Sequence, residues 1–197
     1  MKIGLLSNLR AGGRNRAGHA VLAEARRQPG LVRLETRGSA MVGDAVAAFA
    51  DAGVELLVVN GGDGTLQRVL TEVLGHTPGF RPRIAPLRSG RTNMVALDAG
   101  ASRDPAAALR ALVEQAEDRG LEDRLVPRPV LRLEKVGEEA PHYGMFFGAG
   151  TICRAIELTH RSFPRGRAQG VFGSSLVTGT LLAQLVRGRR DGVLAPD

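Results

Sequence analysis

The sequence predicts an α/β fold: a doubly wound parallel sheet, followed by the start of a second, antiparallel β domain. Short apolar runs alternate with amphipathic segments over the first half of the chain, and polar or glycine-containing loops join them. Strands and helices that alternate at this spacing form parallel sheets with helices on both faces. After about residue 125 a simple alternation of apolar and polar residues takes over, which is typical of antiparallel strands.

The parallel sheet is expected to contain four short strands, because four apolar runs each end in a loop. Pro29-Gly30 ends the first helix near Gln28, and Asp104-Pro105 is a favourable pair for starting the last helix of the domain. The expected strands are 3–7, 31–36, 56–60 and 83–87. Of the expected helices, the first ends near residue 28, the second spans 39–52, the third includes the apolar residues of 66–73, and the last starts at 105.

The boundary between the two domains is predicted at residues 125 and 126. Residues 130–136 alternate, Gly137-Glu138 indicates a turn, and residues 143–147 resemble the partner strand. Further helices are expected at 152–160 and 176–186, and the last residues resemble the way into another strand. We therefore interpret residues 1–125 as the α/β domain and residues 126–197 as the beginning of a β domain, truncated here.

Composition narrows the class of protein. Of the 197 residues 43% are apolar and 24% charged, as in soluble globular proteins. No apolar run reaches the roughly 18 residues of a membrane span, no signal peptide is recognisable, and the single cysteine fits a reducing cytoplasm. The net charge of +7 suits an anionic partner such as a nucleotide or a phospholipid surface. Nucleic acid is disfavoured, because one tyrosine and no tryptophan leave little for base stacking.

The most informative stretch is Gly61-Gly62-Asp63-Gly64-Thr65, directly after the apolar run 56–59. Three glycines let the backbone turn sharply and leave its N–H groups uncovered. Such groups at the start of a helix form a ready anion site, and phosphate is the obvious anion. The structural alternative is a tight strand-to-helix connection with Asp63 or Thr65 as the N-cap.

Ligands of doubly wound sheets bind at the carboxyl ends of the strands. The loops at Asn8, Thr36, Gly61 and Gly90 all follow expected strands, so the site is predicted at the edge that they share. Other chemistry-bearing residues carry weaker signals. The four histidines show no zinc-ligand spacing, and Cys153 is expected to be a small core residue. Asp44 and Glu72 are expected to be exposed helix charges.

Several motifs resemble one family. Gly61-Gly62-Asp63-Gly64-Thr65 matches the signature that diacylglycerol kinase catalytic domains share with NAD kinases, and with phosphofructokinases in a close variant. Asn8-Leu9-Arg10-Ala11-Gly12 is similar to the Asn-Pro-x-Ser-Gly loop of diacylglycerol and sphingosine-type lipid kinases, and Thr36 stands where that family has a nucleotide-contacting threonine. Residues 86–96 resemble its Pro-x-Gly-Thr-x-Asn-x-x-Ala segment, and Phe147-Gly148-Ala149-Gly150 resembles the entry into its β-sandwich domain.

The resemblance implies an ATP- and magnesium-dependent transfer of the γ-phosphoryl group to a lipid hydroxyl, which is largely a matter of positioning and charge neutralisation. Asp63 would organise phosphates and magnesium; further metal ligands and the general base remain unknown. The chain departs from the pattern at Leu9, Arg91 and Met94, which replace a proline, a nucleotide-contacting threonine and a common aspartate. The implied ATP-binding residues are Asn8, Gly12, Thr36, Gly61, Gly62, Asp63, Gly64, Thr65, Gly90 and Thr92.

The resemblance also implies a cytoplasmic protein with peripheral contact at the inner membrane face, and it leaves a homodimer open. Arg161, Arg165 and Arg167 form a basic loop that could face anionic lipid, although a charge run is usually a solvated face. Two alternatives stay open: an NAD kinase-like enzyme, disfavoured because its Asn-Glu pair is missing, and a non-catalytic nucleotide-binding module, favoured by Arg91 and by the missing C-terminal region.

Overall fold

The computed structural model describes residues 1–11, 16–117, 120–138 and 140–147. The chain divides into two compact units, Met1–Met145 and Phe146–Asp197, and nearly all of the second lies outside the described residues. So do the expected helices at 152–160 and 176–186, the basic loop at 161–167 and Cys153. The β domain predicted to begin at residue 126 therefore stays a prediction. Among the described residues, no helix is both long and apolar enough to cross a membrane.

The first unit is an α/β sheet with a small antiparallel sheet after it, as the sequence predicted. The four-stranded sheet has the order β2-β1-β3-β4, and all of its neighbouring strands are parallel. Its elements are β1 (Ile3–Asn8), α1 (Arg16–Ala25), β2 (Val32–Thr36), α2 (Val42–Asp51), β3 (Leu56–Asn60), α3 (Asp63–Thr71), β4 (Arg83–Pro86), α4 (Met94–Asp98) and α5 (Pro105–Glu117).

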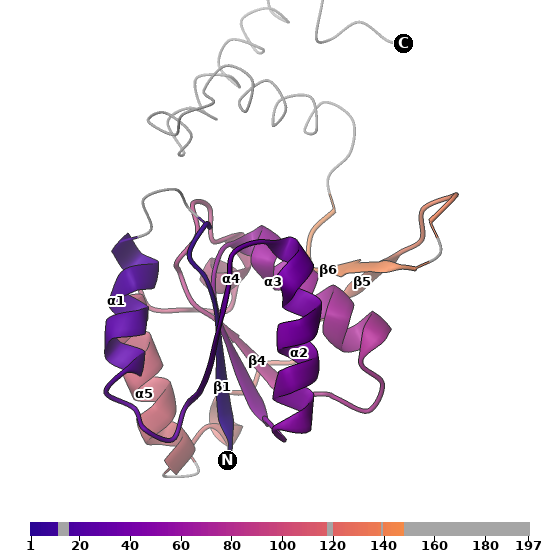
Figure 1. Cartoon of the computed structure of the whole chain (residues 1–197). Helices are drawn as coiled ribbons and strands as arrows, with labels where there is room; N and C mark the ends of the chain where they lie inside the picture. The colour runs from indigo at the N-terminus through magenta and orange to yellow at the C-terminus, as the bar shows by residue number, and fades with distance from the viewer. Residues whose placement is uncertain (12–15, 118–119, 139, 148–197) are drawn as a thin grey trace, which may run out of the picture. The chain divides into compact units, whose positions relative to one another are not determined.

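Helices cover both faces of the sheet: α1 and α5 lie on one side, α2 and α3 on the other (Figure 1). Strand side chains alternate between the two layers. Leu5 and Val58 join the core with α1 and α5, whereas Leu6 and Leu57 join the core with α2 and α3. Every residue of β3 is buried, as expected of a central parallel strand covered on both faces.

A partly buried ion pair joins the two helices of the first layer: Glu24 is buried, whereas Arg110 is half exposed. Arg110 of α5 donates from Nε and Nη2 to the two carboxylate oxygens of Glu24 in α1, at 2.9 and 2.8 Å. This two-bond geometry is the strong form of a salt bridge. The hydrogen bond from Arg110 lowers the pKa of Glu24 to about 2, so Glu24 is ionised wherever the protein is folded near neutral pH. At the N-terminus of α5, the Asp104 carboxylate accepts from the N–H groups of Ala106 and Ala107, which confirms the predicted N-cap.

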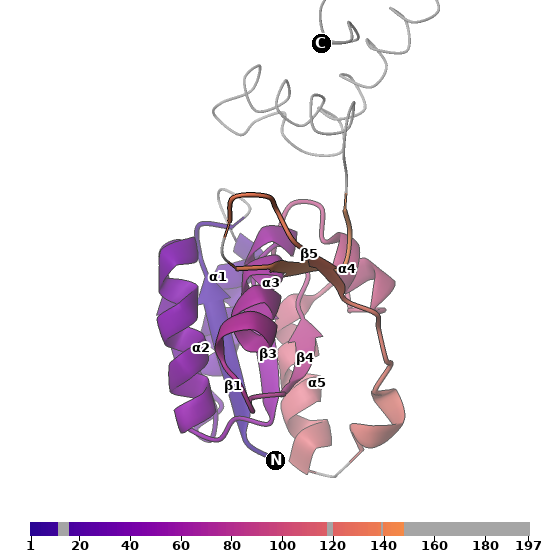
Figure 2. The ribbon, with the colours of Figure 1, turned by 90° about the vertical axis from the view of Figure 1, so that its right-hand side faces the viewer.

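The second sheet is a two-stranded hairpin, β5 (Leu131–Leu133) and β6 (His142–Gly144), that lies beside α3 (Figure 2). Thr71 holds it there: its hydroxyl accepts from the N–H of Tyr143 at 3.0 Å and donates to the carbonyl of the same residue at 3.3 Å. Gln67 donates to that carbonyl as well. The Tyr143 ring packs over Gly75, where a Cβ would come within 3.3 Å of it. The hairpin belongs to the first compact unit.

Two features differ from the sequence-based expectations. The short helix α4 was not predicted, because five residues with only Val95 and Ala96 buried give no readable helical period. After α3 the chain also continues as a π-helical turn, Glu72–His76. Turns of this kind are rare in proteins, and those that occur often lie at functional sites. Glu72 opens this turn and is only 7% exposed, so the expectation of an exposed charge there was wrong.

Candidate functional site

The N-terminus of α3 lies at the carboxyl edge of the sheet, directly after β3. Its N-cap is Gly62 in an extended conformation, without a hydrogen bond from a capping side chain, and Asp63 is the first helical residue. The alternative with Asp63 or Thr65 as N-cap is therefore wrong. The N–H groups of Thr65 and Leu66 donate to the Gly62 carbonyl, and the first N–H groups of a helix have no partner within it. The loop thus presents the positive end of a helix dipole.

A second loop, residues 87–93 after β4, meets this helix start backbone to backbone. A Cβ on Gly90 would lie 2.4 Å from the Cα of Gly62, a distance that only glycine allows. Asn93 fixes the second loop by two hydrogen bonds with Gly90, accepting from its N–H at 2.6 Å and donating to its carbonyl at 3.0 Å. Asn93 itself has φ 53°, a left-handed conformation that asparagine tolerates better than most residues.

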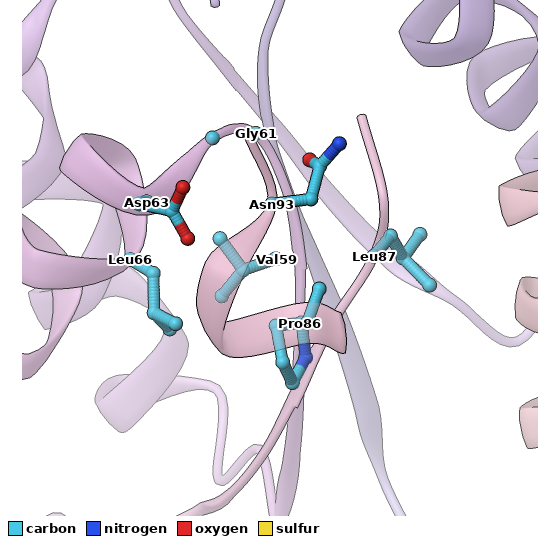
Figure 3. A pocket seen from close by; sticks show the side chains of 9 residues that line it. Val59, Gly61, Asp63, Leu66, Pro86, Leu87 and Asn93 are labelled. Atoms are coloured by element: carbon cyan, nitrogen blue, oxygen red, sulfur yellow. The ribbon is translucent and has the colours of Figure 1, made fainter. Parts of the chain in front are cut away.

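The Asp63 carboxylate bridges α3 and α4. Its Oδ1 accepts from the N–H of Val95 at 3.1 Å, so it satisfies one of the free donors in the first turn of α4. Figure 3 shows Asp63 and Asn93 on either side of a small cavity of about 10 Å³ that Val59, Pro86 and their neighbours close from below. That is roughly the volume of one water-sized sphere. The carboxylate is held in place by the backbone of a neighbouring helix.

The first loop of the chain is tied to the same helix. Asn8 donates from Nδ2 to the Thr65 hydroxyl at 3.0 Å, and its Oδ1 accepts from the N–H of Arg10. Thr65 is 6% exposed, and a Cβ on Gly61 would lie 2.7 Å from its side chain. Thr65 therefore connects the first loop to α3 from within the protein.

These loops border a larger, open cavity of about 440 Å³, within the size range of small-molecule sites. Of the residues predicted to bind ATP, seven line it, while Gly61 lines the small cavity of Figure 3. Thr36 borders neither cavity, and Gly12 lies outside the described residues. The residues that line the larger cavity are Asn8, Arg10, Ala11, Val42, Gly62, Asp63, Gly64, Thr65, Arg68, Gly90, Arg91 and Thr92.

The charges of this cavity favour an anion. Three arginines, at positions 10, 68 and 91, line it with a single carboxylate, that of Asp63. Sequence reasoning did not select Arg10 or Arg68, since an isolated arginine near a loop or in a helix carries no signal by itself. Asn93 was likewise missed, because its role depends on Gly90 being brought against Gly62. Only the fold reveals these residues.

Buried polar atoms mark the same edge of the sheet. Thr36 at the end of β2 and Ser89 after β4 are each 2% exposed, and their hydroxyl oxygens have no hydrogen-bond partner among the described residues. Asn60, at the end of β3, donates to the Ser7 hydroxyl and to the Gly18 carbonyl, while its Oδ1 has no such partner. Buried oxygens of this kind usually pair with ordered water or a ligand.

No cluster of three or more metal-ligating side chains occurs among the described residues. Mg²⁺ does not need one: it commonly takes one or two carboxylates, with phosphate oxygens and waters filling the remaining positions. Asp63 is a carboxylate on the wall of the larger cavity. The residues present therefore fit a magnesium ion that arrives with a phosphate-bearing ligand, with Asp63 as its protein ligand.

The fold and the candidate site define an α/β protein with a cavity at one edge of its sheet, bordered by a glycine loop, a helix N-terminus and arginines. The family model of the diacylglycerol kinase catalytic domain matches residues 2–120, more than half of the chain. The chain belongs to this family. No curated protein matches it significantly.

Three solved structures from Bacillus anthracis str. Sterne are similar, each named a diacylglycerol kinase, two of them only provisionally. Each is 23% identical, with a TM-score of 0.49, over 58% of this chain. The match covers 38%, 41% and 42% of their lengths, so this chain spans about two fifths of those proteins.

Proposed function

We propose that this chain is the nucleotide-binding part of an ATP-dependent phosphotransferase whose acceptor is the hydroxyl group of a lipid of the diacylglycerol type. The observation that carries the proposal is the 440 Å³ cavity in which a helix N-terminus, Asp63 and three arginines converge. Phosphoryl transfer depends mainly on positioning and charge stabilisation, and backbone N–H groups and guanidinium groups provide both for a triphosphate.

The residues have separate tasks in this proposal. The N–H groups of Gly62, Asp63 and Gly64 bind phosphate oxygens, because glycine leaves them uncovered. Asn8 and Thr65 hold the first loop against α3, and Gly90 and Thr92 close the cavity from the second loop. Thr36 and Gly12 stay proposed nucleotide contacts. Asp63 binds magnesium, which when present neutralises phosphate charge and polarises the transferring group.

The lipid acceptor rests on family membership. A lipid acceptor also implies peripheral contact with the inner face of the cytoplasmic membrane, since the hydroxyl group lies at the bilayer surface. These two parts of the proposal are tested together, by transfer of labelled phosphate from ATP to diacylglycerol in mixed micelles or vesicles.

A second candidate is nucleotide binding without transfer by this chain. Asp63 is the single carboxylate among the residues that line the larger cavity, and its Oδ1 already accepts from the N–H of Val95. A general base must then come from residues that do not line this cavity. ATP binding with no transfer to any lipid would favour this candidate over the kinase.

The decisive experiment is calorimetry of ATP binding, with and without Mg²⁺, on the parent chain and on Asp63→Asn. Asparagine keeps an oxygen for the Val95 N–H but removes the charge, so the fold of α4 is preserved. We expect magnesium to raise the ATP affinity of the parent at least tenfold and to have no such effect on Asp63→Asn, as a charged hydrogen-bonding or metal contact is worth about 1.5–3 kcal/mol.

Asp44→Asn is the matched control, because Asp44 is an exposed acid in the first turn of α2 and does not line the cavity. It should bind ATP like the parent. Equal magnesium enhancement in Asp63→Asn and in the parent would remove Asp63 from the site.

A further inference from the structure

Arg68 has a place in the site that its position in the sequence does not reveal. It lies four residues after Gly64 in α3 and four before Glu72, and residues spaced by four share one face of a helix. Gly64 and Arg68 both line the 440 Å³ cavity. Arg68 therefore lies one helical turn after the N–H groups that form the proposed phosphate site, on the same side of α3.

A buried carboxylate holds this arginine. Arg68 Nη2 lies 2.7 Å from Glu72 Oε1, and the Glu72 side chain is only 9% exposed. Helix α2 packs against the same carboxylate: a Cβ on Gly43 would lie 3.3 Å from Glu72 Oε2. His76 Nδ1 lies 3.3 Å from that oxygen on the other side. Glu72 thus contacts α2, His76 and Arg68, and it binds one nitrogen of the Arg68 guanidinium group.

Two observations indicate that Arg68 does more than form a helix ion pair. First, its Nε is buried and has no hydrogen-bond partner among the described residues; a guanidinium group carries five N–H donors in a planar fork, and buried donors without an acceptor are costly. Second, Arg10 and Arg91 line the same cavity. A polyanion bound in this cavity would therefore meet arginines from three segments of the chain.

We infer that Arg68 binds phosphate oxygens of the nucleotide in the larger cavity and that Glu72 is its positioning residue. The inference rests on the proposed function and adds to it a cation outside the glycine loop. A lysine would not be equivalent, because the planar fork of arginine can bind Glu72 and a phosphate at once. An arginine fixed in advance also loses less conformational entropy on binding.

The test compares three ligands on the 197-residue chain: ATP, inorganic tripolyphosphate and adenosine. Arg68→Met keeps the length and the helix propensity but removes every N–H donor. It should lower the affinity for ATP and for tripolyphosphate by about ten- to a hundredfold, the usual effect of losing a charged hydrogen bond, and leave adenosine unaffected. Arg68→Lys should lose part of this affinity. Arg103→Met, at an exposed arginine that does not line the cavity, should match the parent.

Glu72→Gln tests the positioning role. It should reduce the affinity for tripolyphosphate severalfold while leaving that for adenosine unchanged, because the guanidinium loses its charged anchor but the cavity remains. Circular dichroism would show whether each variant is folded. An affinity for tripolyphosphate as high as that of the parent would reject Glu72 as a positioning residue.

The outcomes separate the two proposals. If the parent binds ATP and folded Arg68→Met and Arg68→Lys bind it equally well, the inference about Arg68 is wrong and the proposed function stands. If the parent binds tripolyphosphate as tightly as ATP and Arg68→Met weakens both, Arg68 serves a general phosphate site and the proposed function fails. A parent chain that binds neither ligand overturns both.

Discussion

Two loops meet at the candidate site, residues 61–65 after β3 and residues 87–93 after β4, and they are built differently. In the first, the helix begins at once after the strand, with Gly62 as an extended N-cap. In the second, the shape depends on Asn93, which adopts a left-handed conformation and binds Gly90 through both its amide nitrogen and its amide oxygen.

The difference shows that one loop is determined by neighbouring residues in the sequence and the other by a contact in the folded protein. The first loop is determined by its neighbours in sequence, a buried strand before it and an amphipathic helix after it. The second is determined by what it must fit: the Gly90 backbone lies against Gly62 because no side chain intervenes. A motif can encode the first kind of loop, whereas the contact of Gly90 with Gly62 in the second becomes visible only once the strands are paired.

Substitution of Gly90 should have the largest effect, because it would disrupt the contact between the two loops. In Gly90→Ala the new Cβ would lie 2.4 Å from the Gly62 Cα, and a clash between two backbones cannot be relieved by a change of rotamer. We expect a loss of about 3 kcal/mol of unfolding free energy, at the upper end for overpacking, together with most of the ATP affinity. Urea unfolding and calorimetry would measure both.

Gly30→Ala is the matched control for Gly90→Ala, since a Cβ at Gly30 would meet nothing within 4 Å. It should leave stability and ATP affinity unchanged. Parent-like stability in Gly90→Ala would mean that the two loops are not in contact in solution.

Two substitutions of Asn93 separate its two roles in the second loop, the hydrogen bonds with Gly90 and the left-handed backbone. Asn93→Ala removes both hydrogen bonds with Gly90 and leaves a Cβ in a left-handed conformation, so we expect it to cost about 2 kcal/mol. Asn93→Gly removes the same bonds but relieves the backbone, so about 1 kcal/mol is expected. Unfolding curves of the two variants, recorded together, would test this order; a glycine variant less stable than the alanine variant would contradict it.

The smallest effect is expected within the first loop. Thr65→Val keeps the shape of the side chain but removes the oxygen that accepts from Asn8, which should cost about 1 kcal/mol. Thr65→Ser keeps that oxygen and is the control for the lost bond. If valine is tolerated as well as serine, the hydrogen bond between Asn8 and Thr65 contributes nothing measurable to the link between the loop after β1 and α3.

The α/β class and the four parallel strands were predictable from the sequence, and so was the edge of the sheet that carries the loops after β1, β3 and β4. Buried strands and amphipathic helices have readable periods, and the connection rules for parallel strands leave few topologies. The Gly61–Thr65 loop was recognisable for the same reason, since all of its determinants are adjacent in the chain. The N-cap at Asp104 was local too, and the structure confirms it.

Other features were decided only by tertiary structure. Glu72 looks like any helix carboxylate in the sequence, yet α2 and the π-helical turn bury it beside Arg68. Helix α4 is too short for a period, and the Asp63 carboxylate binds the second residue of that helix from 32 positions away. Such contacts join segments that are distant in sequence, so their partners come together only when the sheet brings the loops to one edge. Sequence by itself determined the fold and the glycine loop; packing decided which side chains complete the site around it.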